Sequence, residues 1–209
     1  QVPGAAKTIL FSHGNAGNLS FRIALIELMV KAGASVFVYD YSGFGRSEGI
    51  PTLEGIVEDG LAAYDYLLSK GVSAGSIVIY GESLGAAVSM QVAALREAHG
   101  VILQSGFASL RRIAAEVFPV AGLYPSQLFP EQQLDTIAML RKPHRRLLII
   151  HGVLDEVVPF GHAESMFAEA VSEKYFLRLP RTSHCDISLT APDEYVAALQ
   201  EFLLRDGAA

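Results

Sequence analysis

The sequence predicts an α/β fold in which a mostly parallel sheet is covered by helices on both faces. Short β-branched and apolar runs alternate with windows of helical, 3.6-residue periodicity along almost the whole chain. Several of these runs, such as residues 36–39 and 147–150, are apolar at every position, as strands buried on both faces must be. The 209 residues, 51% of them hydrophobic, suffice for one such domain and are too few for two of ordinary size.

Six strands are expected, each a short β-rich run bounded by glycine, serine, histidine or charged residues. In chain order they are residues 8–12, 35–40, 76–81, 100–105, 146–151 and 174–179.

Amphipathic helices are expected between the strands, because apolar residues recur on one stripe of a helical period. Thr52 is the expected N-cap of the second helix. The last helix is expected to begin at Pro192, with acidic residues in its first turn and Arg205 near its end. The four stripes are Phe21, Leu25, Leu28, Met29 and Ala32; Leu53, Ile56, Val57, Tyr64, Leu67 and Leu68; Ala163, Met166, Phe167 and Ala170; and Tyr195, Leu199, Phe202 and Leu203.

Residues 106–143 interrupt the alternation between the fourth and fifth strands. The segment is rich in aromatic and aliphatic residues and contains Pro119, Pro125, Pro130 and Pro143. Because proline limits long helices, a small cap of short helices is expected here. The insertion is too small to be a second domain, so residues 1–209 are expected to form a single domain that carries this cap.

The pentapeptide Gly81-Glu82-Ser83-Leu84-Gly85 has the pattern G-x-S-x-G between a predicted strand and a helix rich in small residues. In that context a sharp turn strains the serine backbone and exposes its hydroxyl. The same turn points the first N–H groups of the helix at the space where negative charge would develop. Ser83 is therefore the candidate nucleophile.

A serine hydroxyl needs a base to accept its proton, and the base needs an acid to hold it in one tautomer. His184 lies between the last strand and the last helix, and Asp155 lies in the loop after the fifth strand, so both sit at the carboxyl edge of the predicted sheet with Ser83. They are the candidate base and acid, with Glu156 and Asp186 as rival acids. Four other histidines lie downstream of Ser83, at a strand end or in helical or basic segments, and are not the preferred base: His99, His144, His151 and His162.

Backbone N–H groups near Ser83 are candidates for holding an oxyanion. A glycine-rich turn follows the first strand at residues 12–18 and can present one N–H to the site. Asn15 is the preferred donor there, with Ala16 as the neighbouring alternative. Leu84, the residue after the candidate nucleophile, supplies the second N–H.

Taken together, these motifs resemble the serine α/β-hydrolase superfamily, and the match spans nearly the whole chain. The residues of these motifs are similar to those of the superfamily members that have little or no lid, a branch that includes bacterial hydrolases, esterases and protein-depalmitoylating thioesterases. The resemblance implies the α/β-hydrolase fold and the chain order of nucleophile, acid and base. It rests on residues 13–18 (HGNAGN), residues 39–49 (YDYSGFGRSEG), residues 81–85 (GESLG) and residues 151–159 (HGVLDEVVP).

The expected activity is that of a serine hydrolase cleaving carboxylic esters of short to medium acyl chains through an acyl-enzyme intermediate. An acyl-protein thioesterase and a serine peptidase-like hydrolase are the enzymatic alternatives. A non-catalytic binding module is the alternative of a different class, although such modules commonly lose a member of the triad and none is missing here. The expected acyl pocket consists of Phe44, Phe107, Leu110, Phe118 and Val157.

Composition excludes several other classes. The net charge of −6 argues against nucleic acid as the main partner. The single cysteine, Cys185, permits neither an intrachain disulfide nor a cysteine-based zinc cluster, and no metal and no cofactor are implied. No apolar run is long enough to span a membrane. The expected partner is a small-molecule or acyl-chain ester, and the oligomeric state stays open.

The resemblance also implies two further strands before residue 8. Without them, residues 35–40 form an apolar sheet edge, which is an aggregation hazard. We therefore expect upstream sequence or a neighbouring chain to cover this edge. The chain begins at Gln1 and shows no signal-peptide pattern, so a processed protein or a piece of a longer one is expected, with a cytoplasmic location.

Overall fold

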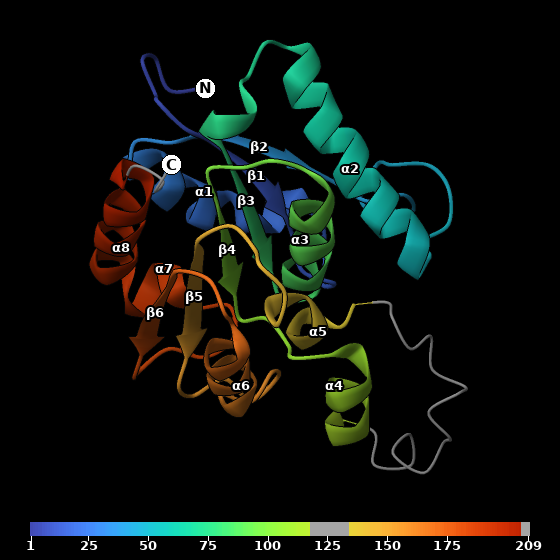
Figure 1. Ribbon diagram of the computed structural model, residues 1–209, viewed down its shortest axis with the longest axis vertical. Helices are drawn as coiled ribbons and strands as arrows, with labels where there is room; N and C mark the ends of the chain where they lie inside the picture. Colours follow the sequence, from blue (N-terminus) through green and yellow to red (C-terminus); the bar gives the residue numbers. More distant parts are fainter. Residues whose placement is uncertain (118–133, 206–209) are drawn as a thin grey trace.

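The computed structural model describes residues 1–117 and 134–205, and its centre is a six-stranded, all-parallel sheet with the order β2-β1-β3-β4-β5-β6 (Figure 1). The predicted parallel α/β fold is confirmed. Two strands have the predicted bounds and the other four differ by one residue at one or both ends. The strands are β1 (Thr8–Ser12), β2 (Ser35–Tyr39), β3 (Ile77–Glu82), β4 (Gly100–Gln104), β5 (Leu147–Gly152) and β6 (Lys174–Leu179).

Helices cover both faces of this sheet (Figure 1). On one face, α1, α7 and α8 pack on β1, β3, β4 and β5 through residues such as Met29, Tyr195 and Phe202. On the other face, α2, α3, α5 and α6 pack on the opposite sides of the strands. The helices are α1 (Ile23–Lys31), α2 (Leu53–Ser69), α3 (Leu84–Leu95), α4 (Leu110–Val117), α5 (Thr136–Leu140), α6 (Gly161–Glu169), α7 (Ile187–Thr190) and α8 (Pro192–Leu204), with 3₁₀ helices η1 (Leu19–Arg22) and η2 (Ala74–Ser76).

The strand order creates one topological switch point in the sheet, between β1 and β3. The chain passes from β1 to β2 on one side and then crosses back to β3 on the other side of β1. The loops that leave β1 and β3 therefore diverge at their carboxyl ends, and open α/β sheets bind ligands at such switch points. The glycine-rich turn after β1 and the candidate nucleophile after β3 consequently face the same space.

The helix boundaries confirm two capping predictions and correct two burial predictions. Thr52 caps α2, because its hydroxyl accepts a hydrogen bond from the N–H of Gly55 at 2.9 Å, and Pro192 is the first residue of α8. Phe21 and Leu68, however, are 72% and 41% exposed. Phe21 lies in η1 before α1 begins, so the period of α1 does not extend to it. Leu68 is in the last turn of α2, where its neighbour Leu67 takes the buried position.

Only part of the predicted cap segment can be described. Residues 110–117 form α4 and residues 136–140 form α5, which packs near α3 and α6. Phe118 and the prolines at 119, 125 and 130 lie outside the described residues. A cap of short helices over that stretch stays a prediction.

Strand β2 is at one edge of the sheet, and all five of its residues are partly exposed. One side of this edge is covered within the chain, because Phe37 stacks on Tyr66 of α2 with ring centroids 5.3 Å apart. Among the described residues, no helix combines the length and the apolar character that a membrane span requires.

Candidate active site

The turn between β3 and α3 holds Ser83 in a strained backbone. Its φ of 54° and ψ of −115° lie in a region that residues other than glycine rarely adopt. Both flanking positions must be glycine because a side chain would clash with the neighbouring backbone. A Cβ added at Gly81 would lie 2.1 Å from the carbonyl oxygen of Gly85, and a Cβ added at Gly85 would lie 1.9 Å from the carbonyl oxygen of Ser12. This close approach of α3 to β1 and β3 pushes the Ser83 side chain toward the carboxyl edge of the sheet.

The structure brings the three predicted residues Ser83, His184 and Asp155 into one hydrogen-bonded series. Nε2 of His184 is 3.1 Å from Oγ of Ser83, and Nδ1 of His184 is 2.7 Å from Oδ2 of Asp155. The Asp155 side chain is fully buried, whereas that of His184 keeps 13% of its surface exposed. Because a carboxylate only accepts hydrogen bonds, Nδ1 of His184 carries the hydrogen and Nε2 is left to accept from the Ser83 hydroxyl.

Asp155 is held ionised by the loop in which it lies. Its Oδ1 accepts hydrogen bonds from the N–H groups of Val157 and Val158, at 2.9 and 2.8 Å. Its Oδ2 lies 3.3 Å from Nε2 of His151, which also donates to the carbonyl of Val158. Burial alone would raise the pKa of Asp155, but the contacts with His151, His184 and the Val158 N–H outweigh it and hold that pKa well below its usual range. Asp155 therefore carries its negative charge throughout the neutral range.

The loop that carries His184 is fixed from two sides. Ser105, the residue directly after β4, donates a hydrogen bond from its hydroxyl to the carbonyl of His184 at 3.1 Å. Asp186 accepts a hydrogen bond from the N–H of Ser183 at 2.7 Å, which uses this rival acid to shape the loop. The other rival acid, Glu156, is exposed to solvent. Of the three carboxylates considered, only Asp155 makes the described contact with His184.

The two expected oxyanion donors flank Ser83. A Cβ added at Gly14 would lie 3.3 Å from Cβ of Ser83, so the turn containing Asn15 runs directly beside the candidate nucleophile. Leu84 is the first residue of α3, where backbone N–H groups have no intrahelical acceptor. The choice between Asn15 and Ala16 as the donor from the turn after β1 stays a prediction.

Three of the expected pocket residues share the apolar core on the α2 and α3 side of the sheet. Phe44, Phe107 and Leu110 belong to one apolar cluster that also contains Leu84. Val157 is 56% exposed and is not a member of that cluster. Phe118 lies outside the described residues.

A buried ion pair beside Ser83 was not expected from the sequence. Nε of Arg22, at the end of η1, is 2.9 Å from Oε1 of Glu82, and both side chains are at least nine-tenths buried. The signal for it was present: Glu82 follows an apolar strand directly, and a buried carboxylate requires a partner. Its partner could not be identified, because Arg22 is distant in the sequence.

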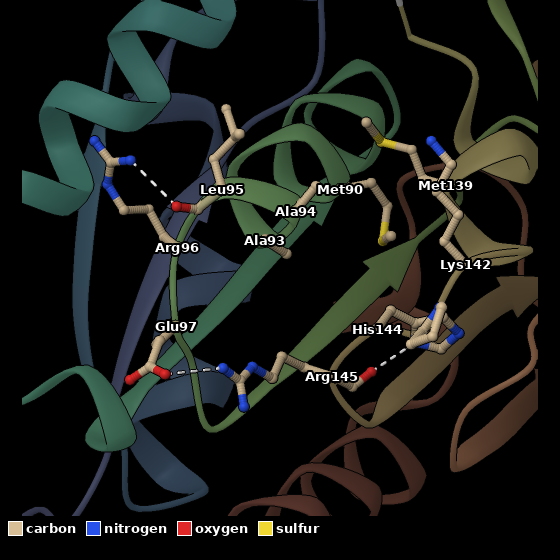
Figure 2. A pocket seen from close by; sticks show the side chains of 11 residues that line it. Met90, Ala93, Ala94, Leu95, Arg96, Glu97, Met139, Lys142, His144 and Arg145 are labelled. Carbon is tan, nitrogen blue, oxygen red and sulfur yellow. Dashed lines mark hydrogen bonds and ion pairs between the residues drawn. The ribbon is translucent and has the colours of Figure 1, made fainter.

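A cavity of about 590 Å³ lies at the other end of α3, away from Ser83 (Figure 2). Two of its basic side chains are already paired, Arg96 with Asp65 at 2.8 Å and Arg145 with Glu97 at 3.3 Å. Figure 2 shows Arg145 pointing toward Glu97 along the cavity wall. None of the candidate catalytic residues lines this cavity, so it is separate from the candidate active site. Within residues 1–117 and 134–205, no group of three or more His, Cys, Asp or Glu side chains is placed to hold a metal ion.

Comparison with known proteins gives concordant matches. The profile of the family described as "Serine aminopeptidase, S33" matches residues 3–146. The protein YfhR of Escherichia coli is 31% identical over 206 residues, which cover 96% of this chain and 71% of YfhR. The human α/β hydrolase domain-containing protein 17B is 34% identical over 207 residues, covering 98% of this chain and 68% of the human protein. Among solved structures, the esterase Pf2001 of Pyrococcus furiosus superposes with a TM-score of 0.79 at 21% identity, over 97% of this chain and 84% of that one, and so shows the same fold.

Proposed function

The chain belongs to the serine aminopeptidase S33 family of the α/β-hydrolase superfamily, and on that premise we propose that it is a serine hydrolase that cleaves carboxylic esters through an acyl-enzyme intermediate. The observation that carries the proposal is the series of hydrogen bonds from Ser83 through His184 to Asp155, set on a strained turn. This geometry combines a nucleophile, a base in the required tautomer and an ionised acid.

In the proposed mechanism, Oγ of Ser83 attacks the carbonyl carbon of the ester while Nε2 of His184 takes the hydroxyl proton. Asp155 stabilises the imidazolium that forms, and the N–H groups of Leu84 and Asn15 hold the oxyanion. The tetrahedral intermediate then collapses, the bond to the alcohol breaks, and His184 gives its proton to the departing oxygen. Water then attacks the acyl carbon while the same imidazole takes a proton from it. The bond from the acyl carbon to Oγ of Ser83 breaks, His184 returns the proton to Oγ, and the carboxylic acid leaves.

Phe44, Phe107 and Leu110 belong to an apolar cluster that also contains Leu84, the residue after Ser83, and this supports an aliphatic acyl group as the part of the substrate nearest to Ser83. These side chains offer no charged partner, whereas a peptidase acting on free amino termini needs a group that binds an ammonium. Each methylene buried there contributes about 0.8 kcal/mol, which favours chains longer than acetyl until the pocket ends. Short to medium acyl esters are therefore the proposed substrate class.

The proposal is tested by measuring hydrolysis of p-nitrophenyl butyrate by the wild-type protein and by Ser83→Ala. The loss of the nucleophile is expected to lower kcat by a factor on the order of 10⁴ or more, without changing the circular dichroism spectrum. Ser188→Ala is the matched control, because Ser188 lies in α7 near the site and makes no described contact with His184. Equal activity in the wild type and Ser83→Ala would overturn the proposal.

A further inference from the structure

Arg22 and Glu82 form a charged pair in the interior, next to the candidate nucleophile. The residues are 9% and 2% exposed, and their charged groups meet at 2.9 Å. Burying two charges is costly, and apolar residues of similar volume often stabilise a fold as well or better. Burial raises the pKa of Glu82, and the positive charge of Arg22 offsets only part of that rise. Because the buried pair gives the fold no clear gain in stability, it is a candidate for a role in catalysis.

Arg22 also contacts the turn that carries the proposed oxyanion donor. Its Nη2 donates a hydrogen bond to the carbonyl of Ala16 at 3.0 Å. This fixes the peptide that begins at Ala16, immediately after Asn15. The guanidinium therefore connects the β3–α3 turn, through Glu82, to the turn after β1.

Gly14 is a second residue of this turn that packs closely against the Arg22–Glu82 pair. A Cβ added there would lie 2.9 Å from Oε1 of Glu82, 3.3 Å from Nη2 of Arg22 and 3.3 Å from Cβ of Ser83. The turn is thus packed against the carboxylate, the guanidinium and the nucleophile on one side of Asn15, and is hydrogen-bonded to Arg22 on the other side. The N–H groups of Asn15 and Ala16 lie between these two restraints.

We propose that the Arg22–Glu82 pair is the positioning element of the oxyanion site, which fixes the turn of residues 14–16 against Ser83. Neither residue touches the substrate, so both act through the backbone of that turn. Preorganised N–H donors stabilise the transition state because they need no reorientation as charge develops. This inference rests on the proposed function and adds residues to it.

The test compares steady-state kinetics of the wild type with those of the double variant Arg22→Met/Glu82→Leu, which replaces the pair with apolar side chains of similar size. Such replacements commonly fold well. We expect kcat for p-nitrophenyl butyrate to fall by about 10²-fold, as when one oxyanion donor is removed. KM should change by less than about threefold, because ground-state contacts with the acyl chain are intact. Inhibition by a trifluoromethyl ketone, which forms an oxyanion on Ser83, should weaken in parallel with kcat, an effect that general loosening of the fold would not produce selectively.

Arg22→Lys keeps the positive charge beside Glu82 but loses the second nitrogen that reaches Ala16, so it should show the same loss in kcat with little change in thermal stability. It carries the test even where the double variant fails to fold. The matched control is Arg96→Met/Asp65→Leu, which removes an ion pair at the far end of α3 and should leave kcat within about twofold of wild type.

A folded double variant, or Arg22→Lys, with wild-type kcat and wild-type inhibition would overturn the inference. Inactivity of Ser83→Ala in the same assay would show that the proposed function nevertheless stands. If Ser83→Ala itself retains activity, the proposed function fails first, and the two failures are thereby distinguished.

Discussion

At the scale of single residues, the site depends on which acid faces His184. Asp155 and Glu156 are neighbours in sequence, yet the loop after β5 buries the first and exposes the second. Two backbone N–H groups and His151 converge on the Asp155 carboxylate, and these contacts hold its orientation as well as its charge. The assignment of roles is therefore testable by exchanging one carboxyl for an amide at each position.

Asp155→Asn is expected to lower kcat by about 10⁴-fold, because an amide in this place favours the wrong tautomer of the histidine. Glu156→Gln is the matched control and should leave kcat close to that of the wild type. Both rates are measured with p-nitrophenyl butyrate at a pH slightly above neutral. A crippled Glu156→Gln beside an active Asp155→Asn would show that the acid is assigned one residue too early.

The buried pair of Arg22 and Glu82 shows what sequence reasoning leaves out at this scale. Ser83 could be identified because G-x-S-x-G carries its own local mechanics, and His184 and Asp155 because they follow predicted strands. The partner of Glu82 is set by the path of η1 past the end of β3, and no local pattern encodes that contact.

At the scale of elements, the apolar character of the strands made them predictable, whereas helix ends were less so. Residues 147–150 are buried on both faces, and their continuous apolar run signals this directly. For α1, the helical period indicates which side is buried but not where the helix begins, so Phe21 was assigned to a stripe that it does not join. Residues 118–133 lie outside the described part, and their predicted form is untested.

The proposed acyl-chain preference rests on Phe107, in the loop between β4 and α4, and on Leu110 of α4, which belong to the apolar cluster that also contains Leu84. We expect kcat/KM to rise from acetyl to butyryl and octanoyl p-nitrophenyl esters and to decline at palmitoyl. Methylenes beyond the end of the pocket stay in water and add no binding free energy. Leu110→Ala should flatten the rise, whereas Leu189→Ala, on the exposed surface of α7, should not. An optimum at palmitoyl would instead support the thioesterase-like alternative.

At the scale of the whole molecule, buried histidines link stability to pH. Burial lowers the pKa values of His13 and His162, even though the carboxylates of Asp40 and Glu116 beside them act in the opposite direction. The unfolded chain therefore binds protons at these residues near pH 6.5, where the native state does not, and stability falls as pH drops below that point. Glu82 acts in the opposite sense, because its raised pKa favours the native state as pH falls.

The midpoint of thermal unfolding should accordingly decrease from pH 7.5 to pH 5.5. His162→Gln should be less stable than the wild type at pH 7.5 but should show a shallower decrease, because one of the titrating groups is gone. Differential scanning fluorimetry over this range is the measurement. A midpoint that is flat between the two pH values would contradict the assignment of neutral, buried histidines.

The central claim is that Ser83 is an activated nucleophile. Its most direct test is covalent labelling with a fluorophosphonate, followed by intact-mass measurement and peptide mapping by mass spectrometry. The account predicts a single adduct, located on the peptide that contains Ser83, formed rapidly in the wild type and absent from Ser83→Ala. Labelling of Ser83→Ala to the same extent, or an adduct on a different residue of the wild type, would contradict it.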